Sequence, residues 1–274
     1  AGASGSSYEP LTRFWATHGY VVIEPTHADS IALRREQGQE SARMRDILEG
    51  SALNDPAAWE ARARDISFIL DSLGEIEQRA PELKGKMDTK RIGVGGHSYG
   101  AYTSQLVGGA TINMPGANRP QSFRDGRPRA IMLLSPQGRN AQGLTDTSWQ
   151  QMTRPMISMT GTLDKGLGGQ PYEWRLDPFN FSPAGDKYQV LIEGANHLSF
   201  TGRLAEDRPA LGLLARRSAR LNGGADQKAI FDYIKMASLA FWDAYLKDEG
   251  KAKEYLKSDA LVAYSRNIVK LSRK

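Results

Sequence analysis

The sequence predicts an α/β fold built on a doubly wound, mostly parallel sheet. Three observations support this. Short apolar segments alternate with amphipathic helical ones, a serine between two glycines separates one strand from the helix after it, and polar residues follow two later strands. The carboxyl ends of parallel strands meet at one edge of such a sheet, where ligands bind. We therefore expect a functional site at that edge.

Length and composition limit the possible classes of protein. No Pro-, Ser- or Gly-rich linker divides the 274 residues, so we expect a single domain over 1–274. The 36 basic and 31 acidic residues are interleaved, which argues against a nucleic-acid partner. Cysteine is absent, which excludes disulfides, thiolate metal sites and a cysteine nucleophile. No apolar run approaches the ~20 residues that a membrane span needs, and no signal peptide is present, as would also hold for an exported protein without its leader.

The first third of the chain predicts two helices and a strand. Apolar residues recur at helical spacing over 8–18, and the apolar run 20–23 is typical of a buried parallel strand. A second helix is expected to begin at Asp55-Pro56, an N-cap followed by proline, and to carry one apolar stripe as far as Leu73.

The same alternation continues along the rest of the chain. Three further strands are expected, at 129–134, 155–160 and 188–192. A long helix is expected over 229–247. Residues 111–128, with three prolines and two glycines, and the arginine-rich residues 201–224 are expected to be loop or cap-like excursions.

A serine flanked by glycines lies between a short β-prone segment and a helical one, in the motif Gly96-x-Ser98-x-Gly100. A chain that turns from strand to helix within a few residues and presents a hydroxyl at the apex needs glycine on both sides, because a Cβ there would collide with the turn. We interpret Ser98 as the nucleophile of such an elbow and expect His97 to point away from it. The alternative is an ordinary glycine-rich turn.

A serine hydroxyl is a poor nucleophile near neutral pH, so it needs a histidine base that is oriented by a carboxylate. In this fold class both are expected downstream, in the order serine, acid, histidine. His197 is the one histidine downstream of the elbow, directly after a strand. Asp164 follows the preceding strand, and Asp146 and Asp177 are its competitors. We expect Ser98, Asp164 and His197 to form a catalytic triad, and simple packing or turn roles are the alternatives.

The intermediate of such a reaction also needs N–H donors for its oxyanion. The backbone N–H of Tyr99 is expected to be one of them, and the glycine-rich stretch 1–5 lies where the other is expected. The Tyr99 side chain is an equal candidate for the substrate cleft or for packing. Further candidates for substrate binding, each equally consistent with plain packing, are Trp149, Trp174, Phe179, Phe200 and residues 111–128.

Together these segments resemble the α/β-hydrolase superfamily. More narrowly, they are similar to the predicted dienelactone hydrolases that are grouped with platelet-activating-factor acetylhydrolases and polyester-cleaving cutinases. The similarity covers Ser7 to about Phe200. It rests on four motifs, His18-Gly19-Tyr20-Val21-Val22, Gly96-His97-Ser98-Tyr99-Gly100, Gly161-Thr162-Leu163-Asp164 and Gly194-Ala195-Asn196-His197-Leu198-Ser199-Phe200.

The resemblance also carries departures from the family pattern. Similar members have a Ser-His-Gly strand end just before the position of Ala1, which implies that the family's first strands lie upstream of residue 1 and that the Ala1 N–H is the second oxyanion donor. True dienelactone hydrolases use a cysteine, which this chain lacks. Plasma acetylhydrolases take their acid from the loop after the earlier strand, where 134–138 holds no carboxylate. The acid position is therefore closer to that of cutinases and carboxylesterases.

The sequence thus predicts a serine carboxylic-ester hydrolase that acts through an acyl-enzyme on small or medium esters or on polyesters. No cofactor and no metal are expected, and the partner is the ester substrate. A peptidase or thioesterase with the same triad, and a non-catalytic binding protein with the same fold, are the alternatives. Acyl length, alcohol partner, oligomeric state and compartment are not determined by the sequence.

Overall fold

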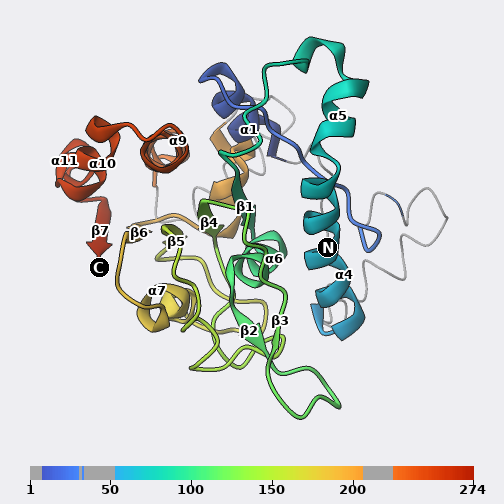
Figure 1. The fold of residues 1–274 in the computed structure, drawn as a ribbon. Helices are drawn as coiled ribbons and strands as arrows, with labels where there is room; N and C mark the ends of the chain where they lie inside the picture. The colour runs from blue at the N-terminus through green and yellow to red at the C-terminus, as the bar shows by residue number, and fades with distance from the viewer. Residues whose placement is uncertain (1–7, 31–32, 34–52, 206–224) are drawn as a thin grey trace.

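The computed structural model describes residues 8–30, 33, 53–205 and 225–274 (Figure 1). Within them a five-stranded sheet has the order β1-β4-β5-β6-β7. Its strands are β1 (Gly93–His97), β4 (Ala130–Leu134), β5 (Met156–Gly161), β6 (Lys187–Ile192) and β7 (Val269–Arg273). The first four are parallel, and β7 pairs antiparallel with β6. The expectation of an α/β fold with a mostly parallel sheet is confirmed.

Helices separate and flank these strands. The α-helices are α1 (Glu9–Thr17), α4 (Pro56–Asp71), α5 (Leu73–Arg79), α6 (Tyr99–Gly108), α7 (Asp177–Phe181), α9 (Gln227–Leu246), α10 (Gly250–Lys257) and α11 (Ala260–Tyr264). The predicted start of α4 is confirmed, because the Asp55 side chain accepts a hydrogen bond from the Ala57 N–H at 3.0 Å and Pro56 is the first helical residue. No helix in the described ranges is long and apolar enough to cross a membrane.

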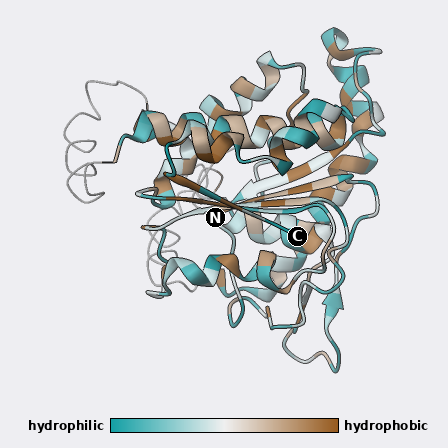
Figure 2. Ribbon diagram, turned by 90° about the vertical axis from the view of Figure 1, so that its left-hand side faces the viewer, coloured by the Kyte–Doolittle hydropathy of each residue, from teal (hydrophilic) through white to brown (hydrophobic). Residues whose placement is uncertain are grey.

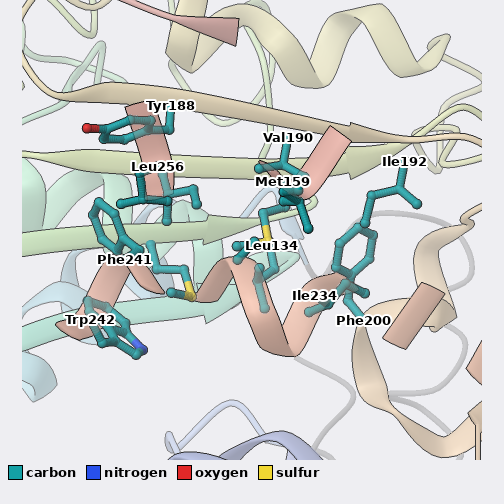
Figure 3. Close-up of a cluster of buried hydrophobic side chains, with 14 of the residues drawn as sticks. Leu134, Met159, Tyr188, Val190, Ile192, Phe200, Ile234, Phe241, Trp242 and Leu256 are labelled. Carbon is teal, nitrogen blue, oxygen red and sulfur yellow. The ribbon is translucent and has the colours of Figure 1, made fainter. Parts of the chain in front are cut away.

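The sheet is buried on both faces. Successive residues of β4 point to opposite sides, so Met132 and Leu134 join one apolar cluster whereas Ile131 and Leu133 join another. Helices lie on both sides of the sheet in Figure 2. In Figure 3, side chains of β4, β5 and β6 meet those of α9 in the first cluster. This two-sided burial explains why the central strands are nearly continuous apolar runs.

One expectation for the segments outside the sheet is wrong, and another is incomplete. Residues 20–23 form no strand, and Val21 and Ile23 are exposed. A strand needs a neighbour for its backbone N–H and C=O groups, and in the described part of the chain β1 pairs with β4 alone. Residues 111–128 are more than a loop, because they contain the antiparallel pair β2 (Thr111–Ile112) and β3 (Gln121–Ser122). Of the second excursion, 206–224 lie outside the described residues.

Candidate active site

Ser98 occupies a strained turn between β1 and α6. Its φ of 55° and ψ of −119° are unusual for a residue with a side chain, and such conformations cost on the order of 1–3 kcal/mol. The turn is held from both sides, because the Ser98 N–H donates to the Leu134 carbonyl at 2.9 Å and its own carbonyl accepts from the Tyr102 N–H at 3.0 Å. The serine is therefore presented, partly exposed, at the carboxyl edge of the sheet.

Only one of the two flanking glycines is required by the packing of the turn. A Cβ at Gly96 would overlap the backbone of Gly100, where α6 passes closest to β1. A Cβ at Gly100 would meet nothing within 4 Å among the described residues. The expectation is confirmed for Gly96 and wrong for Gly100.

These two glycines give a matched pair of variants. Gly96→Ala is expected to lower the free energy of unfolding by about 1–3 kcal/mol, because the turn must open to admit a methyl group. Gly100→Ala should leave it unchanged or raise it by up to about 1 kcal/mol, because alanine is the better helix former. Urea unfolding of both proteins measures the difference. Equal stabilities would contradict the close approach at Gly96.

Asp164 is a sealed carboxylate with three hydrogen-bond partners and an ion pair to Arg175. It is 0% exposed. Its Oδ1 is 2.9 Å from His197 Nδ1 and 2.9 Å from Arg175 Nε. Its Oδ2 accepts from the Ser135 hydroxyl at 2.5 Å and the Thr160 hydroxyl at 3.0 Å. Burial by itself would raise the pKa of Asp164, but the hydrogen bond to His197 and the charge of Arg175 outweigh it, so the pKa is lowered. The carboxylate is held in its ionised form.

The acid turn after β5 and the histidine loop after β6 are joined directly. The Leu163 N–H donates to the Ala195 carbonyl at 3.0 Å, and the Gly194 N–H donates to Thr162 Oγ1 at 2.9 Å. Gly161 permits this approach, since a Cβ there would overlap the Ala195 carbonyl. The two loops therefore place acid and base as one unit.

His197 begins the short 3-10 helix η5 (His197–Thr201), which Asn196 caps by accepting from the Leu198 and Ser199 N–H groups. The His197 side chain is 34% exposed, unlike the carboxylate behind it. Its ring centroid is 4.5 Å from that of His97, the neighbour of Ser98. The structure thus brings the predicted base beside the residue that precedes the predicted nucleophile, and no hydrogen bond joins Ser98 to His197 among the described residues.

His97 and Tyr8 form a further pair that the sequence did not reveal. We expected His97 only to point away from the serine, but its ring lies next to the base. Burial and the nearby His197 lower the pKa of His97 well below its ordinary value, so this imidazole is neutral. Its Nδ1 is 2.6 Å from the Tyr8 hydroxyl, and burial raises the pKa of Tyr8 to about 12. Both groups are therefore uncharged, and of the two it is His97 that contacts the base.

The competing acids lie elsewhere. Asp146 and Asp177 each come within 3.5 Å of the Arg139 guanidinium, and Asp177 also accepts from the Arg139 backbone N–H at 3.0 Å. Asp164 is the aspartate that the described structure places on His197.

Sequence position could also have indicated Ser135 and Thr160, because both lie where a strand ends. Nothing local in the sequence marks Arg175.

Most of the predicted substrate-binding aromatics are packed in the protein interior. Trp149 is fully buried and donates to Gln105 Oε1 at 2.6 Å, while Phe200 is fully buried and stacks on His97 at 5.9 Å. For these two the structure supports the packing alternative.

Two more aromatics and the N-terminal donor also belong to the predicted set. The Tyr99 side chain is buried, with the Arg62 guanidinium 4.3 Å from its ring centroid. Trp174 is half-buried and donates to the Arg139 carbonyl at 2.8 Å. Ala1, the predicted second oxyanion donor, lies outside the described residues.

The fold and the site define an α/β protein in which a buried aspartate and a partly exposed histidine lie beside the strained turn that holds Ser98. Comparison of the sequence with protein-family models and with curated proteins finds no match. The geometry of the site is therefore the basis for a functional conclusion.

Proposed function

We propose that this chain is a serine carboxylic-ester hydrolase of the α/β-hydrolase type. The observation that carries the proposal is the 2.9 Å contact between buried Asp164 Oδ1 and His197 Nδ1, beside the Ser98 turn. An ionised carboxylate holds the proton on Nδ1, which leaves Nε2 able to accept one. That is the arrangement required to activate a serine hydroxyl.

In the proposed reaction Ser98 Oγ attacks the ester carbonyl while His197 Nε2 takes the hydroxyl proton. The oxyanion that forms is stabilised by the Tyr99 N–H at the N-terminus of α6, where the helix dipole favours negative charge, and by the N–H of Ala1. His197 then returns the proton to the leaving alcohol, and the acyl group remains on Ser98. Water, deprotonated by the same base, releases the acid. No step calls for a cofactor.

The lack of a hydrogen bond between Ser98 and His197 in the described structure does not exclude this scheme. Catalytic hydrogen bonds are often long or poorly aligned before substrate binds and tighten in the complex.

Covalent labelling tests the proposal. A fluorophosphonate should form one adduct on Ser98, identified by peptide mass spectrometry, and Ser98→Ala should abolish it. Native protein without an adduct at Ser98 would exclude the serine-hydrolase mechanism and favour a binding protein with the same fold. A panel of p-nitrophenyl esters from acetyl to long chains, an insoluble polyester, a thioester and a peptide anilide then separates ester hydrolysis from the alternatives.

Two exposed leucines suggest that the substrate is apolar. Leu163 precedes the acid and Leu198 follows the base, and both are exposed. Leu198→Ser and Leu163→Ser are each expected to lower kcat/KM for an octanoyl ester about fivefold, which corresponds to roughly 1 kcal/mol of apolar contact, and to leave the acetyl ester unaffected. Tyr264→Ser, an exposed aromatic on α11, is the control. Equal losses on both esters would contradict a role in binding the acyl chain.

A further inference from the structure

Arg175 is a buried cation that ties the acid to two loops. It lies in the 3-10 helix η4 (Tyr172–Leu176) and is 3% exposed. While Nε contacts Asp164, Nη1 donates to the carbonyls of Ser135 at 2.8 Å and Pro136 at 3.0 Å. Nη2 donates to the Lys165 carbonyl at 3.0 Å. One planar guanidinium therefore holds the segments that follow β4 and β5 at a set distance.

The same side chain reaches the base. Arg175 Nη2 is 3.4 Å from His197 Nδ1. Because Nδ1 donates its proton to Asp164 over the shorter distance, it cannot also accept one from the guanidinium. The contact therefore places a positive charge against the imidazole edge where positive charge develops on protonation.

Among the described residues, the other groups in contact with the His197 ring or its neighbour His97 are uncharged. His97 lies on the His197 ring with a ring-centroid distance of 4.5 Å, and the Tyr8 hydroxyl bonds to His97. Burial lowers the pKa of Arg175, and the ion pair with Asp164 acts in the opposite direction; a guanidinium keeps its charge in proteins. Of the described residues in contact with the pair, Asp164 and Arg175 thus set the local charge, and the two cancel.

We propose that Arg175 is a positioning residue: it fixes the Asp164 carboxylate and sets its guanidinium charge against the His197 imidazole, which opposes the gain of a second positive charge at that ring. Its catalytic consequence rests on the proposed ester hydrolysis. An arginine with a purely structural role would hold the Asp164 carboxylate in place but would not affect the charge of the His197 ring. Experiments can therefore separate the two roles.

The test uses Arg175→Gln and Arg175→Lys. Both should lower kcat about 10- to 100-fold with little change in KM, because the acid turn is less well placed. In Arg175→Gln the acidic limb of the kcat–pH profile should move up by about one to three pH units, the usual effect of removing an adjacent charge. Arg175→Lys retains the charge and should leave the limb in place.

Arg273→Gln is a matched control. Arg273 also donates to backbone carbonyls, those of Leu256 and Ser258, and pairs with Asp259, but it lies on β7. Its loss should leave the acidic limb unmoved. The proposal is overturned if the acidic limb of the kcat–pH profile stays in place in Arg175→Gln, or if it moves by the same amount in Arg273→Gln.

A readout without substrate separates this proposal from the hydrolase assignment. In protein with isotope-labelled histidine, the NMR titration midpoint of the His197 ring should move up in Arg175→Gln and stay in Arg175→Lys. This shift without any adduct on Ser98 would refute the hydrolase and retain the role of Arg175. If Arg175→Gln does not fold, the NMR signal of the Arg175 Nε–H group is followed in the wild-type protein instead. A change in that signal as the pH is varied through the titration of His197 supports the coupling between the two side chains. A signal that does not change overturns the proposal.

Discussion

Ser98→Ala and His197→Ala should each reduce ester turnover by about 10⁶-fold, and the double variant should be scarcely worse. The reason is that nucleophile and base act as a unit: without the imidazole the hydroxyl keeps its proton, and without the hydroxyl the imidazole has nothing to activate. Initial rates on an acetyl or butyryl p-nitrophenyl ester measure the effect. Each variant should unfold at the same urea concentration as the wild type within experimental error, which separates lost chemistry from lost structure.

His18→Ala is the control for the base, because His18 is an exposed histidine after α1. It should retain wild-type turnover. Losses that add in the Ser98/His197 double variant would mean that the two side chains work in separate steps, contrary to the proposed mechanism.

Asp164→Asn is expected to lower kcat by about 10⁴-fold. The carboxylate now accepts from three donors and pairs with Arg175, and an asparagine offers one acceptor atom, so its NH₂ group must face donors or the guanidinium. His197 then loses the partner that holds its proton on Nδ1, and Arg175 becomes a buried charge without a counter-ion, which typically costs about 3–5 kcal/mol. Activity and stability should therefore fall together.

The pH dependence of that stability loss is a second check on Asp164. The pKa of Asp164 is lower in the folded protein than in the unfolded chain, where an aspartate has its ordinary pKa of about 4. The ionised carboxylate therefore stabilises the fold fully above about pH 4. This stabilisation is lost as the pH falls through the pKa of Asp164 in the folded protein. The difference in urea stability between wild type and Asp164→Asn should therefore be full at neutral pH and shrink on acidification. A difference that grows below pH 4 would contradict the charged, paired carboxylate.

Asp146→Asn serves as the matched control. Asp146 is the exposed alternative candidate for the acid, and it forms an ion pair with Arg139. It should keep turnover within about twofold, as surface substitutions commonly do. Activity that survives Asp164→Asn and disappears in Asp146→Asn would reassign the acid.

The central strands could be predicted because their burial is visible in the sequence. Strands expected at 129–134, 155–160 and 188–192 correspond within one residue to β4, β5 and β6. A parallel strand that is covered on both faces is apolar along most of its length, and few other short segments have that composition.

Whether the first and last apolar segments of the chain form strands depends on the presence of a neighbouring strand, which amino-acid composition does not reveal. The apolar run 20–23 forms no strand, whereas β7, which we did not predict, pairs along β6 from Tyr188 to Ile192. A short strand is stable only when a neighbour accepts its hydrogen bonds, and that neighbour is chosen by the fold as a whole.

The sequence by itself determined the order of Ser98, Asp164 and His197 and their places after strands, because turn chemistry and strand ends leave a local pattern. Only the tertiary structure decided what surrounds them. It placed Arg175 on the acid, brought Tyr8 through His97 toward the base, and put Trp149 and Phe200 in the interior. Burial and charge pairing join residues far apart in the chain, and no short stretch of sequence records such contacts.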